Sequence, residues 1–352
     1  MTTVLIGTVI FIALPQYATK MVQQDAWITA HMASFWGILV VLTIVALSKR
    51  FPGYTLTEYL PIVIGKPLGL VLGLLYASWF MFIGAFTTLE VTIFFSSLIL
   101  PVTPFLVIVI SLMIVVYYAL QKGLEVWVRA NELLLVLIIL SIILVVFLPY
   151  NYMDLRRLLP IGEHDLSALL EVSLKGGSLR GEIMMLGMFI PLLTCNKNVN
   201  RNMILTVVMA GVFLGAVEMA AVAVFGGANT ANSEFTIHSL ASMVNIGTVI
   251  SRIEILVVIM WLAASFIKIC ALLYCSAVAT ADSVGLKDYK FLLLPLIIIS
   301  ILLVQSYGVA IESVEDLVSD ALVGFGLLTF ELGIPVLLLL IAVMRKKRQT
   351  AT

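Results

Sequence analysis

Long apolar runs recur along almost the whole chain, and short charged segments separate them. Hydrophobic residues make up 62% of the 352 residues and charged residues only 11%, whereas soluble domains carry roughly 25% charged residues. Many runs approach the length of about 20 residues that an α-helix needs to cross the hydrocarbon core of a bilayer. The sequence therefore predicts an all-α integral membrane protein.

The apolar runs predict ten transmembrane helices, at residues 2–19, 26–48, 68–99, 104–120, 130–149, 166–194, 202–225, 250–280, 291–308 and 317–344. Ten spans divide into two sets of five, and an odd number of spans inverts the second set relative to the first. We therefore expect a single transmembrane domain over 1–352, with one five-helix repeat at 1–150 and an inverted one at 151–352. Of the 20 Lys and Arg residues, most fall in segments that lie inside if the N-terminus is inside, which predicts cytoplasmic termini.

Three glycines and three charges interrupt the sixth span, in the run Lys-Gly-Gly-Ser-Leu-Arg-Gly-Glu that ends at Glu182. An interrupted membrane helix is tolerated where its freed backbone groups face protein, water or a ligand, and such interruptions mark binding sites in secondary transporters. We therefore predict a break at Gly176, Gly177 and Ser178, with Glu182 as the principal pocket or gating residue. Gly7 and Thr8 predict a weaker break in the first span, for which close helix packing is the alternative.

Five ionisable residues fall within predicted spans, and each costs at least about 2.5 kcal/mol in a bilayer: Glu90, Glu182, Glu218, Lys268 and Glu331. Lys268 is interpreted either as an ion-coupling residue or as one half of a structural ion pair, for example with Glu331. Glu331 itself could couple to protons or ions, or simply pair with a cation. Glu218 is expected to be solvated or structurally paired.

Glu90 shares a helix face with Ile83 and Trp79 by its spacing of three or four residues, and this face could line the pocket. The alternative is a carboxylate in a water-filled outer vestibule. Arg252 and Glu254 lie at the outer entrance of the eighth span, and we expect them to form an outer gate network, with Glu182 or Arg180 as candidate partners.

Several functional classes have no support in the sequence. There is no phosphate-binding Gly-rich loop with its lysine, and no metalloprotease or ion-channel filter motif. The three cysteines suit apolar packing better than a disulfide or a metal site, and the three histidines have no ligand spacing. We expect neither enzymatic activity nor a cofactor, a metal or a nucleic acid partner.

An ordered set of short strings carries a resemblance to a known family: Gln24-Asp25-Ala26-Trp27-Ile28, Arg50-Phe51-Pro52-Gly53-Tyr54, Leu159-Pro160-Ile161-Gly162-Glu163-His164, Gly181-Glu182-Ile183, and Arg252-Ile253-Glu254 with Phe266-Ile267-Lys268. Together they resemble the B subunit of spore germinant receptors, in the spore germination permease family. That family is similar to amino acid–polyamine–organocation transporters, so the resemblance implies a LeuT-like fold with broken spans 1 and 6.

The resemblance also implies a function. A B subunit would recognise a nutrient germinant, often an amino acid, and would work with an A-type subunit and a lipoprotein C-type subunit in the inner membrane of the spore. Glu182, Arg252, Glu254 and Lys268 match polar positions of the family. The alternative is a proton-coupled secondary transporter of amino acids or organic cations, in which Lys268 and Glu331 would matter most.

Overall fold

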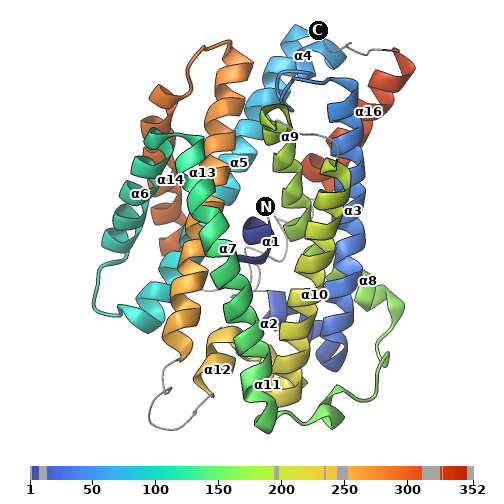
Figure 1. The fold of residues 1–352 in the computed structure, drawn as a ribbon, viewed down its shortest axis with the longest axis vertical. Helices are drawn as coiled ribbons and strands as arrows, with labels where there is room; N and C mark the ends of the chain where they lie inside the picture. The colour runs from blue at the N-terminus through green and yellow to red at the C-terminus, as the bar shows by residue number, and fades with distance from the viewer. Residues whose placement is uncertain are drawn as a thin grey trace.

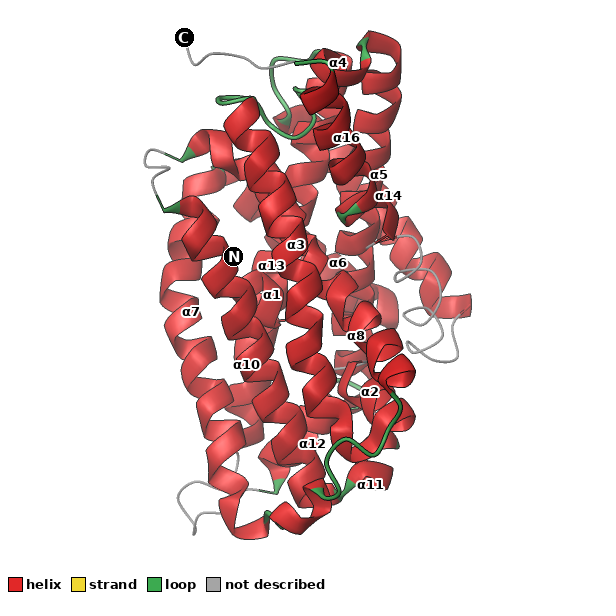
Figure 2. Cartoon of the chain, turned by 90° about the vertical axis from the view of Figure 1, so that its right-hand side faces the viewer, coloured by secondary structure: helices red, strands yellow, loops and turns green. Residues whose placement is uncertain are grey.

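The structure is a computed structural model that describes residues 2–7, 14–193, 198–233, 235–243, 253–310, 326 and 328–346. Within these ranges the protein is helical throughout, without a β-strand. Its long helices run roughly along the longest axis of the molecule (Figure 1), and a view turned by 90° shows the same elongated bundle (Figure 2). Seven described helical stretches are long and apolar enough to cross a membrane. The chain is therefore a multi-pass membrane protein.

The first half of the chain supplies four of the long helices together with three short ones. In chain order these are α1 (Thr2–Gly7), α2 (Leu14–Val22), α3 (Ala26–Arg50), α4 (Leu60–Ile64), α5 (Lys66–Phe94), α6 (Phe105–Lys122) and α7 (Leu124–Phe147). Gln23 has a φ of 38° at the corner between α2 and α3. Gly123, with a φ of 97°, separates α6 from α7, a conformation that a residue with a Cβ rarely adopts.

The second half is more interrupted. It comprises α8 (Leu166–Gly181), a 3-10 segment (Glu182–Met185), α9 (Leu186–Phe189), a 3-10 turn (Ile190–Leu192), α10 (Val199–Phe225), α11 (Gly227–Ala231), α12 (Thr236–Ser242), α13 (Ile253–Val284), α14 (Lys290–Ala310) and α16 (Gly333–Met344). Residues 328–331 have π-helical geometry before α16 begins. The junctions α6–α7 and α13–α14 lie toward the same end of the bundle as α4 and the end of α16 (Figure 1).

The predicted sixth span is broken, but the break lies later than the glycines suggested. Gly176, Gly177 and Ser178 are all α-helical, and α8 continues to Gly181 before the backbone tightens to 3-10 geometry at Glu182. The prediction of a break at Gly176–Ser178 is therefore wrong by about one turn. The reason is packing, since a Cβ on Gly177 would lie 2.8 Å from Cβ of Trp36 in α3.

Small residues let three helices of the core approach closely. A Cβ added to Gly37 of α3 would meet Cβ of Arg180 in α8 at 3.0 Å and Cγ1 of Val207 in α10 at 2.9 Å. Gly211 of α10 likewise packs against the Ser34 hydroxyl of α3. Small residues at helix crossings are a common solution in membranes, where the gain comes from close van der Waals contact. The glycines of α3 and α10 thus let α3 pack closely against α10 and against α8, the helix that leads into the break.

The other half of the core is the long contact between α5 and α13. Tyr76, Phe80 and Leu89 of α5 are almost fully buried, as are Leu272 and Leu273 of α13. The hydroxyl of Ser276 in α13 donates a hydrogen bond of 2.8 Å to the carbonyl of Ala77 in α5. Cys270 and Cys275 of α13 are buried free thiols, which confirms the prediction of apolar packing for these two cysteines. Cys195 lies outside the described residues.

Candidate functional site

A buried ion pair lies at the point where the sixth span changes geometry. Nζ of Lys268 lies 2.9 Å from Oε1 and 2.8 Å from Oε2 of Glu182. Both side chains are nearly inaccessible, at 3% and 4% exposure. Glu182 opens the 3-10 segment, whereas Lys268 is near the middle of α13. The pair therefore connects the interrupted span to the helix that packs against α5.

Glu331 lies beside this pair and fits into the space next to Gly181, which has no side chain. Its carboxyl group is 1% exposed and lies so close to Gly181 that an added Cβ there would overlap Oε2 and approach Cδ to 2.8 Å. The charge of Glu331 interacts with both Glu182 and Lys268. The sequence left open an ion pair of Lys268 with a span carboxylate, for example Glu331; the carboxylate to which Nζ of Lys268 donates a hydrogen bond is that of Glu182.

Glu90 of α5 completes a cluster of charges in the centre. It is 8% exposed, and its charge interacts with Lys268 and Glu182. The alternative of a carboxylate in a water-filled vestibule is therefore wrong. Among the described residues, the cluster thus contains three carboxyl groups, from α5, the broken span and the segment before α16, and a single ammonium group from α13.

Aromatic and small side chains form one wall next to the cluster. The ring of Trp79 stacks on Phe330, with centroids 4.9 Å apart and planes 6° from parallel. A Cβ on Gly326 would lie 2.8 Å from the Ser178 hydroxyl and 2.9 Å from Cζ2 of Trp79. The structure thus brings Trp79 and Ser178 together from α5 and α8. Ile83 is buried in the hydrophobic core one turn further along α5.

The proposed half-site in the first span is only partly described. α1 ends at Gly7, and the next described helix begins at Leu14. Thr8 lies outside the described residues. α1 packs against α7, α10 and α13 and lies near mid-height of the bundle (Figure 1). The first span therefore enters the core beside the helix that carries Lys268.

A second pair of buried charges joins α8 to α10 and α3. The guanidinium of Arg180 donates to the carbonyls of Gly176, at 2.9 Å, and Ala30, at 2.8 Å. It also interacts electrostatically with Glu218 of α10, which is fully buried. Glu218 is therefore buried rather than solvated, and the charge near it is that of Arg180; a direct structural pairing of the two side chains stays a prediction. Arg180 is engaged by these groups, so the suggested pairing of Arg180 with Glu254 is not formed.

Glu254 lies far from the central cluster. It is 14 residues before Lys268 on one continuous helix, which is about 21 Å along the axis. Its charge acts on His238 of α12. Burial lowers the pKa of His238, and the Glu254 carboxylate opposes that shift. Glu254 therefore lies outside the central cluster that holds Glu182. Arg252, the other member of the expected outer gate network, lies outside the described residues, so that network stays a prediction.

Aromatic side chains lie on both sides of the cluster along α13. About 10 Å before Lys268 along the helix axis, Trp261 makes an edge contact with Phe94 of α5, at 4.6 Å between centroids. About 9 Å beyond Lys268, Tyr274 stacks on Phe189 with 5.4 Å between centroids. The charged centre is therefore separated from both ends of the bundle by packed aromatic rings.

Sequence reasoning missed one contributor to this centre and one buried polar residue on the helix that carries Lys268. Gly181 was considered only as part of the interruption, although its lack of a side chain makes room for Glu331. Ser265 was not considered, yet it lies one turn before Lys268 and is fully buried. Its spacing of three residues from Lys268 was the available signal.

Comparison with known proteins shows which family the chain belongs to. The sequence model described as spore germination protein matches residues 1–309. The chain belongs to this spore germination protein family. Spore germination protein KB of Bacillus subtilis (strain 168) is 23% identical over 338 residues, which cover 94% of this chain and 90% of the relative. Spore germination protein XB of Bacillus anthracis is 25% identical over 187 residues, covering 53% of this chain and 52% of the relative.

Most of the central cluster lies within the range that the family model matches. The matched range includes Glu90, Glu182 and Lys268, and it ends before Glu331. The similarity to spore germination protein KB extends over nearly the full length of both chains. The family model therefore covers the described helices as far as most of α14, and the roles of single residues within them are a matter for proposal and test.

Proposed function

We propose that this spore germination protein is a B-type subunit of a germinant receptor, which recognises a nutrient and changes conformation in response. The observation that carries the proposal is the buried pair of Glu182 and Lys268 at the break of the sixth span. A buried charge pair is costly to maintain and is weak support for a purely stabilising role. In membrane spans such residues are functional candidates by default.

We propose a fold of ten spans in two inverted five-helix repeats, 1–150 and 151–352, of the LeuT-like type. The interruption of the sixth span supports it, where α8 is followed by 3-10 segments and α9. Interrupted spans in corresponding places of two halves are the usual sign of such repeats. The excess of Lys and Arg in alternate loops supports cytoplasmic termini.

An α-amino acid suits the chemistry of the centre. Glu90, Glu182 and Glu331 outnumber Lys268 among the described residues, so a ligand ammonium group would find carboxylates to receive it. A ligand carboxylate would find the ammonium group of Lys268, or backbone N–H groups at the break and in the first span near Gly7 and Thr8. Trp79, Ile83 and Ser178 would form the wall against which its side chain rests. Gly177 contributes to the packing of α8 against Trp36, and the carbonyl of Gly176 accepts a hydrogen bond from Arg180.

The proposal includes an assembly. In it, the chain works with an A-type subunit and a lipoprotein C-type subunit in the inner membrane of the spore. The similarity to spore germination protein KB, which covers nearly the full length of both chains, supports this assembly. Such a subunit would carry a signal through its helices and would perform no chemical reaction.

A germination assay with matched variants tests the proposal. Spores would carry the receptor with wild-type chain, Glu182→Gln or Glu125→Gln, and would be exposed in turn to single amino acids, sugars and nucleosides. Glu125 is exposed and pairs with Arg129 on the same helix, so its variant controls for the loss of one carboxylate. We expect Glu182→Gln to insert normally and to abolish the response, while Glu125→Gln responds as wild type. A normal response of well-inserted Glu182→Gln would contradict the proposal.

The second candidate function is proton-coupled transport of amino acids or organic cations. The surplus of carboxyl groups around Lys268 favours it, because such groups in membrane spans can exchange protons or bind cations. Purified chain in proteoliposomes would be tested for amino acid uptake driven by a proton gradient. Gradient-driven uptake by this chain alone would count against a pure receptor, and the absence of uptake with retained ligand binding would favour the receptor.

A further inference from the structure

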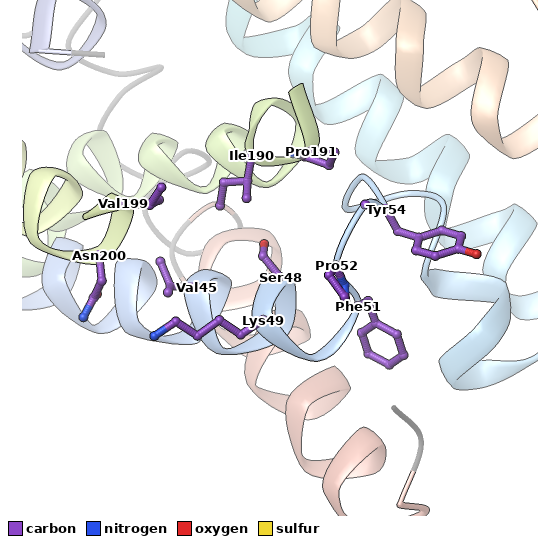
Figure 3. Close-up of a pocket in the computed structure, with 11 residues that line it drawn as sticks. Val45, Ser48, Lys49, Phe51, Pro52, Tyr54, Ile190, Pro191, Val199 and Asn200 are labelled. Atoms are coloured by element: carbon purple, nitrogen blue, oxygen red, sulfur yellow. The ribbon is translucent and has the colours of Figure 1, made fainter. Parts of the chain in front are cut away.

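A pocket lies at the end of the bundle that carries α4 and the basic loops, away from the central charge cluster. Its volume is about 470 Å³, enough for a small molecule or a headgroup. The lining comes from the end of α3, the loop at residues 51–54, the turn at Ile190–Leu192 and the first turn of α10. Figure 3 shows these segments surrounding it.

Ser48 is the most informative residue of this pocket. Its side chain is 7% exposed, and its hydroxyl has no hydrogen-bond partner in the described part of the chain. A buried hydroxyl without a partner is costly, because it loses its hydrogen bonds to water and gains none. Figure 3 shows the hydroxyl directed from α3 toward the segment that carries Ile190. The hydroxyl is therefore available to a ligand.

The remaining polar groups favour an anionic ligand. Lys49 is the one charged residue among the described residues that line the pocket, and it follows Ser48 directly. Val199 and Asn200 also line the pocket and belong to the first turn of α10. α10 has 27 residues, and its N-cap residue Asn198 makes no capping hydrogen bond with its side chain in the described part of the chain. The N-terminus of a long helix attracts anions, and phosphate in particular.

A second, mostly apolar groove continues from the pocket. It has a volume of about 410 Å³ and shares Ile190 and Val199 with the pocket. Leu186, Leu193 and Met203 also line it. A polar pocket beside an apolar groove at the end of a transmembrane bundle has the form of a site for an anionic lipid, with its headgroup in the pocket and an acyl chain in the groove.

The geometry points to a phosphate-binding site formed by Ser48, Lys49 and the N-terminus of α10, with the headgroup of an anionic phospholipid as its favoured source of phosphate. Binding there would contact the turn that follows the interrupted sixth span. The amide of Leu56, in the segment between α3 and α4, donates to the carbonyl of Gly187 in α9 at 3.0 Å, so this segment and the sixth span are already connected. The influence of the ligand on the central cluster rests on the proposed function, whereas the binding itself does not.

Lipid retention and soluble phosphate binding test this inference separately. The purified chain would be placed in nanodiscs containing equal amounts of phosphatidylglycerol and phosphatidylcholine, and retained lipid would be counted by native mass spectrometry. In a second arm, sn-glycerol 3-phosphate and inorganic phosphate would be titrated in phosphatidylcholine nanodiscs while the unfolding midpoint is followed. Ser48→Ala and Lys49→Gln are the variants. Lys66→Gln is the control, because Lys66 is an exposed cation at the same end that does not line the pocket.

We expect wild type to retain phosphatidylglycerol over phosphatidylcholine. Losing one charge-assisted hydrogen bond should weaken binding roughly tenfold in Lys49→Gln, with a smaller loss in Ser48→Ala and none in Lys66→Gln. Ser48→Ala should fold normally, because the hydroxyl that it removes has no partner. Binding of soluble phosphate without lipid preference would support the site with a free phosphate ligand. Binding of neither probe, or equal binding by Lys49→Gln and Lys66→Gln, would overturn the inference.

Discussion

At the scale of single residues, Glu182 and Lys268 are placed so that removing either leaves the other charge buried. Loss of one partner of a buried pair costs about 3–5 kcal/mol, whereas replacing both with neutral groups often costs little. This difference separates a structural role from a ligand-binding role. A pair that only stabilises the fold can be replaced as a unit, and a pair that binds ligand cannot.

We therefore predict that Lys268→Met alone lowers the thermal stability of the purified chain markedly. The double variant Glu182→Gln with Lys268→Met should regain much of this stability, because one of the uncompensated carboxylates is then removed. The nutrient response should stay lost in the double variant. Thermal unfolding in detergent and the germination assay measure the two effects, and a response that returns together with stability would show that the pair is structural.

A second prediction at this scale concerns Gly181. Gly181→Ala would place a methyl group against the Glu331 carboxyl, and overpacking of this kind costs about 1–3 kcal/mol. Gly84→Ala is the control, because its nearest neighbour, Cβ of Leu272, is at 3.4 Å, an ordinary contact. We expect Gly181→Ala to lower the unfolding midpoint and the nutrient response, with Gly84→Ala close to wild type. Equal behaviour of the two variants would refute the role assigned to Gly181.

At the scale of elements, a network at one end of the bundle joins the corner between α2 and α3 to the loop before α8. Oδ1 of Asp25 accepts from the amide of Gly162 at 2.8 Å, and Oδ2 accepts from the amide of His164 at 3.2 Å. Nδ1 of His164 lies 2.9 Å from Oδ2. Nε2 of Gln24 donates to Oε2 of Glu163 at 2.7 Å. Two of the strings that carry the family resemblance are thus in direct contact.

Asp25→Ala should release this loop. The amides of Gly162 and His164 would lose their acceptor, at a cost of about 1–3 kcal/mol. We expect faster hydrogen–deuterium exchange in residues 159–165 and a weaker nutrient response, because the corner between α2 and α3 would no longer hold the loop before α8. Asp154→Ala is the control, since Asp154 is exposed and caps only a local turn through the amide of Arg156. Unchanged exchange in Asp25→Ala would contradict the coupling.

At the scale of the whole molecule, the proposed topology places alternate loops on opposite sides of the membrane. A cysteine introduced at exposed Arg156 should react with a membrane-impermeant maleimide from outside intact cells, because this loop is external in the proposed arrangement. A cysteine at exposed Lys66 should react only after the cells are opened. Labelling of both positions from the same side would contradict two inverted five-helix repeats.

The helical, multi-span character of the chain was predictable from the sequence, for a physical reason. A bilayer requires every spanning segment to satisfy its own backbone hydrogen bonds, so apolar runs predict helices with good bounds; α6 and α10 begin and end within a few residues of their predicted limits. The site was predictable only in part. Glu182 and Lys268 are visible as charges in apolar runs, but their pairing depends on how helices from distant parts of the chain pack.

The sequence by itself determined that this protein is a helical membrane bundle of the spore germination family, with an interruption near Glu182. Local composition decides these properties, because a membrane sorts segments by hydrophobicity and tolerates glycines and charges only where they have partners. The tertiary structure alone decided that the helix passes unbroken through Gly176 and Gly177 and that Lys268 binds Glu182. Those outcomes depend on whether Trp36 and Glu331 occupy the space beside the glycines of α8, which only the packing of the whole bundle sets.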